Sequence, residues 1–168
     1  SNRERGEAVF SITLSCVGKL KEKFYLSAAA EYQKRLSGLC TFQLIELPEV
    51  RLSENPSDAE IAQGLKREAD AIRVKIPKGS WLCAMAIEGK ALSSEALAKM
   101  LAGVKQSGKS SACFLIGSSF GLDASLKASA DFRLSISPMT FPHHLARIMV
   151  LEQLYRAESI QAGSKYHK

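Results

Sequence analysis

A regular alternation between strand-length apolar runs and segments with a helical repeat constrains this sequence more than any other feature. Residues 10–17 alternate apolar and small polar side chains, which is the period-two pattern of a β-strand. Residues 22–36 place apolar side chains three or four positions apart, as an amphipathic helix does. Because strands that alternate with helices usually pair in parallel, the pattern predicts an α/β domain with a mainly parallel sheet flanked by helices.

The same alternation continues to the C-terminus. Further strands are expected at residues 41–47, 81–87, 111–116 and 132–137. Further helices are expected at about residues 57–73, 93–106, 124–130 and 143–157. Ser57 and Glu60 match the capping-box signature for the start of the first of these helices.

Length and charge limit the class of protein. The 168 residues fit one domain, which we place at residues 10–168. Residues 1–9 are mostly polar and charged, and we expect them to form a disordered extension rather than a signal peptide. No apolar run approaches the roughly 20 residues of a membrane span, which predicts a cytoplasmic protein with no membrane partner. The formal net charge of +6 favours a polyanionic partner.

The four cysteines are far apart, form no CxxC pair and mostly lie inside apolar runs. They are Cys16, Cys40, Cys83 and Cys113. This pattern is typical of buried, reduced thiols, and metal ligation is the less favoured interpretation. We therefore expect no bound metal.

Residues 103–110 fit the letter pattern of a phosphate-binding P-loop, but their context does not. A P-loop leaves a strand and opens a helix, so that free N–H groups at the helix start face the phosphates. Here the segment is expected to end a helix and to lead into the strand at Ser111. Its glycines are better explained by a helix C-cap and a turn.

Three loop segments follow consecutive predicted strands: Glu88–Lys90, Gly117–Leu122 and Pro138–Pro142. In parallel α/β sheets ligands bind outside the carboxyl ends of the strands, so these segments are predicted to form one pocket rim. Glycines let backbone groups approach a ligand closely, and prolines hold a loop in a fixed shape. Such a rim suits a neutral, hydrogen-bonding adenosine. The alternative is that these segments are simply well-formed turns.

Several of these segments together resemble a known family. The segments are Val17–Phe24, Leu115–Leu122, Leu134–His143, Leu151–Ala157 and Tyr166–Lys168. They are similar to the ribosomal RNA large subunit methyltransferase H family, which belongs to the SPOUT methyltransferases. The resemblance covers nearly the whole chain from about Phe10. It implies a SPOUT α/β-knot, in which the C-terminal segment threads through a loop to make a trefoil knot.

The resemblance also implies a reaction. The expected activity is transfer of a methyl group from S-adenosyl-L-methionine to N3 of a pseudouridine in 23S ribosomal RNA of the assembled 70S ribosome. The implied cofactor contacts are Met85, Gly117, Ile136, Ser137, Pro138, Met139, Thr140 and Phe141. Met85 stands where the family usually has leucine, which conserves volume. Ser118 replaces the second glycine of a usual pair, which would weaken cofactor binding if that position needed a positive φ or an uncrowded backbone.

The C-terminal tail supplies the candidate catalytic residues. Tyr166 and His167 are predicted to close over the base, with His167 as the proton acceptor and Arg156 as a positioning or charge-neutralising group. The alternative for His167 is a role in RNA binding alone. The side chains expected to bind the RNA substrate are Lys168, Lys19, Lys21 and Arg147.

Ile148–Leu151 are four successive apolar residues, which point in nearly all directions around a helix. One domain face cannot bury them all, so we expect a second copy of the chain to cover this helix, and the resembled family also implies a homodimer. Two other functions remain open. One is an RNA-binding or ribosome-binding protein that keeps the fold without turnover. The other is a SPOUT enzyme acting on transfer RNA, which the terminal Tyr166–Lys168 disfavours.

Overall fold

A single parallel sheet forms the centre of the protein. The computed structural model describes residues 9–167, so Lys168 and all of the predicted N-terminal extension except Val9 lie outside the described residues. The five strands are β1 (Ser11–Val17), β2 (Thr41–Leu47), β3 (Trp81–Ala91), β4 (Ser111–Ile116) and β5 (Phe132–Ser135). They pair in the order β2-β1-β4-β3-β5, and every pairing between these strands is parallel.

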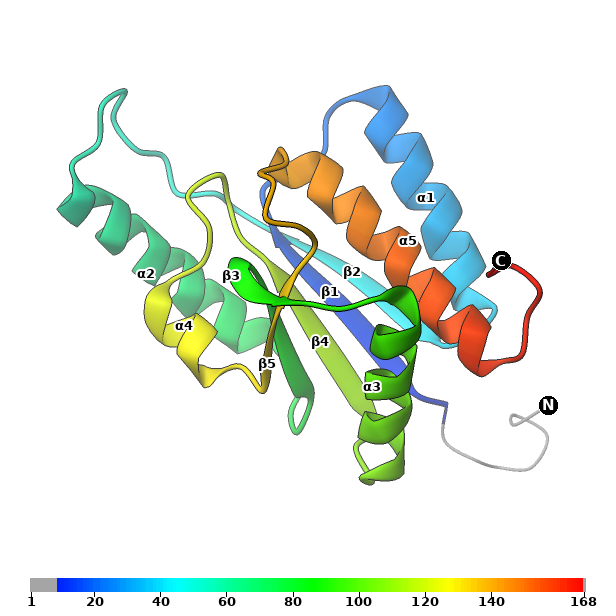
Figure 1. The fold of residues 1–168 in the computed structure, drawn as a ribbon. Helices are drawn as coiled ribbons and strands as arrows, with labels where there is room; N and C mark the ends of the chain where they lie inside the picture. Colours follow the sequence, from blue (N-terminus) through cyan, green and yellow to red (C-terminus); the bar gives the residue numbers. More distant parts are fainter. Residues whose placement is uncertain (1–8, 168) are drawn as a thin grey trace.

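Helices cover both faces of the sheet. One face carries α1 (Lys23–Ser37), α3 (Ser94–Gln106) and α5 (His143–Gln161), with α5 packed between the other two (Figure 1). The other face carries α2 (Asp58–Lys75) and α4 (Ala124–Ser129). The predicted α/β class, with a parallel sheet flanked by helices, is therefore confirmed.

The period of two along the strands divides the core into two halves. In β4, Phe114 points toward α3 and α5, whereas its neighbours Cys113 and Leu115 point toward α2 and α4. All three side chains are fully buried. A strand with both faces covered must be apolar throughout, which is why β4 and the first half of β3 show almost no polar residues.

The third strand is longer than predicted. Residues 88–90 were expected to be a turn after the strand, but β3 continues to Ala91. Met85 and Lys90 both pair with Leu134 of β5, so the residues between them form a bulge in the strand. A Cβ at Gly89 would lie 2.6 Å from the carbonyl oxygen of Arg133, so the bulge depends on a glycine at this position.

Two local predictions from sequence hold at helix ends. The Ser57 side chain accepts a hydrogen bond from the N–H of Glu60, and the Glu60 carboxylate accepts one from the N–H of Ser57, so the capping box is present. The segment that mimics a P-loop ends α3 and leads into β4 through Gly108, which has a φ of +92°. Its glycine therefore forms a turn rather than a phosphate cradle.

The last helix is covered within a single chain. Every residue of α5 is buried or half-buried. Ile148 packs on the core, while Val150 and Leu151 are buried within it. The four successive apolar residues therefore do not require a second copy, and the homodimer stays a prediction.

The trefoil knot concerns the path of the chain through its own loops and also stays a prediction. Within residues 9–167, no helix has the length and apolarity to cross a membrane.

Candidate active site

The bulged part of β3 and the loops that follow β4 and β5 meet around one pocket of about 350 Å³. We call it the loop pocket, and its volume is in the range of small-molecule sites. Of the residues predicted to bind the cofactor, all except Pro138 line it. Those residues are Met85, Gly117, Ile136, Ser137, Met139, Thr140 and Phe141. From the predicted rim segment 88–90, Glu88 lines the pocket.

The loop after β4 owes its shape to two glycines. A Cβ at Gly117 would collide with the carbonyl group of Gly121, so the loop closes tightly on itself. Gly121 has a φ of +84°, and its N–H donates a 2.8 Å hydrogen bond to the carbonyl of Ser118. Ser118 is buried and does not have a positive φ. The serine therefore fits this backbone without strain, and the family's usual glycine is not needed here for its conformation.

The chemistry of the loop pocket suits an adenosine. Met85, Ile136 and Phe141 give the pocket apolar walls. Residues 136–142 form neither helix nor strand, so their backbone N–H and C=O groups take no part in the hydrogen bonding of the sheet. Large apolar side chains surround it and stay exposed: Ile87 by 54%, Phe120 by 47% and Met139 by 72%. Exposed apolar side chains gathered at a concave site are typical of ligand-binding surfaces.

The C-terminal tail lies against α5 rather than over the loop pocket. The Tyr166 hydroxyl donates a 3.0 Å hydrogen bond to Glu152, and Arg156 donates to the same carboxylate at 2.8 Å. The Arg156 guanidinium lies 4.8 Å from the centre of the Tyr166 ring. Burial and the hydrogen bond to Glu152 raise the pKa of Tyr166, so its hydroxyl keeps its proton at physiological pH. Tyr166 and Arg156 thus meet at Glu152, and the third predicted catalytic residue, His167, contacts Arg156.

His167 is held at both ring nitrogens. Its Nδ1 lies 3.0 Å from Arg156 Nη1, and its Nε2 lies 2.6 Å from the carboxylate of Glu95 in α3. A guanidinium can only donate, so Nδ1 accepts and Nε2–H donates to Glu95. The hydrogen bond from His167 lowers the pKa of the Glu95 carboxyl. For His167 to take up a proton on Nδ1, Arg156 must first release that nitrogen.

Comparisons with known proteins identify the family of this chain. The family described as "Predicted SPOUT methyltransferase" matches residues 10–167. The chain belongs to the SPOUT methyltransferase family. It is 46% identical over 157 residues to the ribosomal RNA large subunit methyltransferase H of Streptococcus equi subsp. zooepidemicus, covering 94% of this chain and 99% of that protein. The protein of the same name from Clostridioides difficile is 44% identical over 158 residues, with the same coverage of both chains.

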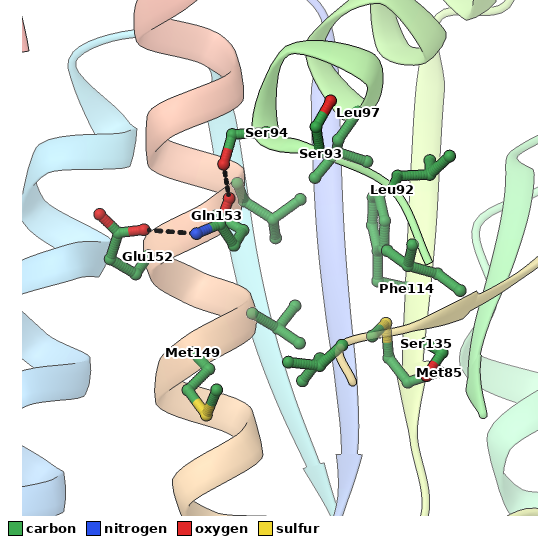
Figure 2. Close-up of a pocket in the computed structure, with 14 residues that line it drawn as sticks. Met85, Leu92, Ser93, Ser94, Leu97, Phe114, Ser135, Met149, Glu152 and Gln153 are labelled. Atoms are coloured by element: carbon green, nitrogen blue, oxygen red, sulfur yellow. Dashed lines mark hydrogen bonds between the residues drawn. The ribbon is translucent and has the colours of Figure 1, made fainter. Parts of the chain in front are cut away.

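A second cavity of this SPOUT chain was not anticipated from the sequence. It has a volume of about 380 Å³ and lies between α3, α5 and the sheet, and we call it the helix cavity (Figure 2). Met85, Phe114 and Leu134 contribute to its apolar wall, and Ser94 and Gln153 to its polar side. No sequence motif marks it, because its residues come from five separate elements, β3, α3, β4, β5 and α5, that only the fold brings together.

The basic residues predicted to bind RNA in this SPOUT chain differ in exposure. Lys19 and Lys21 are exposed and line a third pocket beside the start of α5. Arg147 is only 1% exposed and donates hydrogen bonds to Glu46 at 2.6 Å and to the Gly18 carbonyl at 2.9 Å. In this conformation Arg147 is not accessible to RNA. Its hydrogen bonds instead connect α5 to the ends of β1 and β2.

The cysteines of this SPOUT protein are all free and buried. Burial raises the pKa of Cys16, Cys40 and Cys83 to about 12, and that of Cys113 to about 11. The predicted buried thiols are thus confirmed. Within residues 9–167, no group of three or more metal-ligating side chains is placed to hold a metal ion.

Proposed function

We propose that this protein uses S-adenosyl-L-methionine to methylate N3 of a pseudouridine in large-subunit ribosomal RNA, on assembled ribosomes in the cytoplasm. The observation that carries the proposal is the placement of the motifs. Residues from β3 and from the loops after β4 and β5 that resemble the family's cofactor motifs line one pocket. The residues of the matching C-terminal motif gather around Glu152, which lines the adjoining helix cavity.

The loop pocket is the proposed site of the methyl donor. Met85, Ile136 and Phe141 would pack against the adenine, and the backbone of residues 137–140 would hydrogen-bond to its polar edge. Glu88 and Lys127, which form a 2.6 Å ion pair and line the same pocket, would offer charged groups to the polar groups of the nucleoside. The sulfonium of the donor supplies an electrophilic methyl group and leaves as a neutral thioether.

The chain itself must orient the acceptor base and remove a proton. The N3 nitrogen forms its bond to the methyl carbon as the carbon–sulfur bond breaks, and the N3 proton passes to a base. His167 is the proposed proton acceptor, with Arg156 holding its ring until RNA binds. Lys19, Lys21 and Lys168 are proposed to contact RNA phosphates.

A homodimer is part of this proposal. Two large apolar side chains of α1 stay exposed in the single chain, Phe24 by 66% and Leu26 by 46%. They lie on the helix that packs beside α5, on the same side of the sheet as the helix cavity. A second copy of the chain that covers them would bring its surface close to the proposed site.

Methylation of isolated ribosomes tests the function directly. Ribosomes from a strain lacking this enzyme are incubated with the protein and radiolabelled S-adenosyl-L-methionine, and the nucleosides of the large-subunit RNA are then separated. We expect label in a single methylated pseudouridine. Label in ribosomal RNA at another nucleoside would correct the target, and label in transfer RNA would assign the chain to a different SPOUT activity.

Donor binding in the same preparation separates activity from fold. Isothermal titration should detect S-adenosyl-L-methionine binding to the wild-type protein and weaker binding to a Met85→Asp variant, because a carboxylate would disrupt the apolar wall. A protein that binds the donor but methylates no RNA would favour the alternative of an RNA-binding protein without turnover.

A further inference from the structure

The proposed reaction requires a second site, for the acceptor base, next to the donor site. In-line transfer needs the reacting atoms about 3 Å apart, so the two sites must adjoin. The helix cavity shares Met85, Leu134 and Ile136 with the loop pocket. The third pocket shares only His143 with it. The helix cavity is therefore the better placed neighbour.

The lining of the helix cavity matches a flat heterocyclic ring. Phe114, Leu97 and Leu154 are buried apolar residues on its walls. Ser94 and Gln153 bring polar groups to one side, where Figure 2 shows them pointing toward each other. Nucleobases have apolar faces and a polar edge, and enzymes that modify a base bind it between apolar side chains while hydrogen-bonding its edge.

A chain of hydrogen bonds links the helix cavity to the candidate catalytic tail. The Ser94 hydroxyl donates to Gln153 Oε1 at 2.6 Å, and Gln153 Nε2 donates to Glu152 at 3.1 Å. Glu152 also accepts from Arg156 and Tyr166. The side chain that organises the tail therefore also lines the helix cavity. A base in this cavity would lie beside the residues proposed to handle its proton.

We propose that the helix cavity receives the acceptor base, flipped out of the RNA, and that Gln153 recognises its polar edge. This inference rests on the proposed function. A pseudouridine has an N1–H donor, whereas the N1 of a uridine is bonded to the ribose. The Gln153 amide has a second lone pair and a second hydrogen besides those used by Ser94 and Glu152, so it can accept from N1–H and donate to a ring carbonyl.

The test compares two substrates and two variants. Ribosomes that carry either a pseudouridine or an unmodified uridine at the target nucleotide are methylated by wild-type protein, by Gln153→Leu and by Gln106→Leu. Gln106 is exposed at the end of α3 and provides a matched control. For Gln153→Leu we expect kcat/KM on the pseudouridine substrate to fall by about 10- to 100-fold, because a polar edge loses its partner. The preference for pseudouridine over uridine should fall with it.

A third variant tests the cavity without changing its polar groups. Val150→Phe adds a ring to a side chain that lines the helix cavity. We expect it to reduce methylation while affinity for S-adenosyl-L-methionine stays unchanged, and thermal melting checks that the variant folds.

Each contrary result has a distinct meaning. Wild-type activity on pseudouridine together with full activity and full preference in Gln153→Leu would overturn the inference and leave the proposed function intact. Weaker donor binding by Gln153→Leu would assign the helix cavity to the donor instead and would also overturn it. Wild-type protein that methylates neither substrate would overturn the proposed function, and the inference would fall with it.

Discussion

At the scale of single residues, the environment of His167 decides what it can do. A histidine near the chain end has many accessible roles, and sequence reasoning left proton transfer and RNA binding equally open. The structure places its Nδ1 against Arg156 and its Nε2 against Glu95. Two such partners fix the ring orientation and the neutral tautomer, which is the form that can accept a proton.

Replacing His167 with glutamine separates its two roles. Glutamine can accept from Arg156 and donate to Glu95, but it cannot take up a proton. We expect His167→Gln to lower kcat by about 100-fold or more, because a general base typically contributes at least that factor. Single-turnover methylation of ribosomes would measure it. A rise in KM with kcat unchanged would instead identify His167 as an RNA contact.

At the scale of secondary-structure elements, local chemistry sets the boundaries where the sequence carries it. The start of α2 was predictable because Ser57 and Glu60 satisfy each other's backbone N–H groups without help from the rest of the fold. The end of β3 was not, because the strand continues past the bulge only through its pairing with β5. Tertiary pairing thus overrides a local turn signal.

Removing the α2 cap should cost measurable stability. We expect Ser57→Ala to lower the free energy of unfolding by about 1 kcal/mol, since the backbone N–H of Glu60 loses its side-chain acceptor. Urea denaturation at a fixed protein concentration measures the change. Ser27→Ala is the control, because Ser27 is exposed within α1 and alanine favours a helix. A Ser57→Ala protein as stable as wild type would show that the capping box is not important for stability.

At the scale of the whole molecule, the sheet order brings the candidate site together. The strands β4, β3 and β5 are neighbours in space, so the bulged part of β3 and the loops that follow β4 and β5 line one pocket. The same packing places α5 between α1 and α3, so a single helix lines the helix cavity and also carries the residues that hold the tail.

The oligomeric state tests the assembly. Light scattering should give twice the mass of one chain, and Phe24→Asp should shift the protein toward monomer, because a charge would replace an exposed apolar side chain on α1. Val74→Asp is the control: Val74 is 81% exposed on α2, on the opposite face of the sheet. A wild-type monomer at micromolar concentration would contradict the proposed homodimer.

The sequence by itself determined the α/β class, nearly every strand and helix and the cap of α2, because periodicity and local hydrogen bonding lie in short stretches of chain. The residues around the loop pocket came from the resemblance of contiguous motifs to the SPOUT family. Only the tertiary structure decided that Arg147 is buried, that Ser118 needs no positive φ and that a helix cavity adjoins the loop pocket. Each of these depends on residues far apart in the chain or on a backbone conformation, and packing between separate elements leaves no local pattern in the sequence.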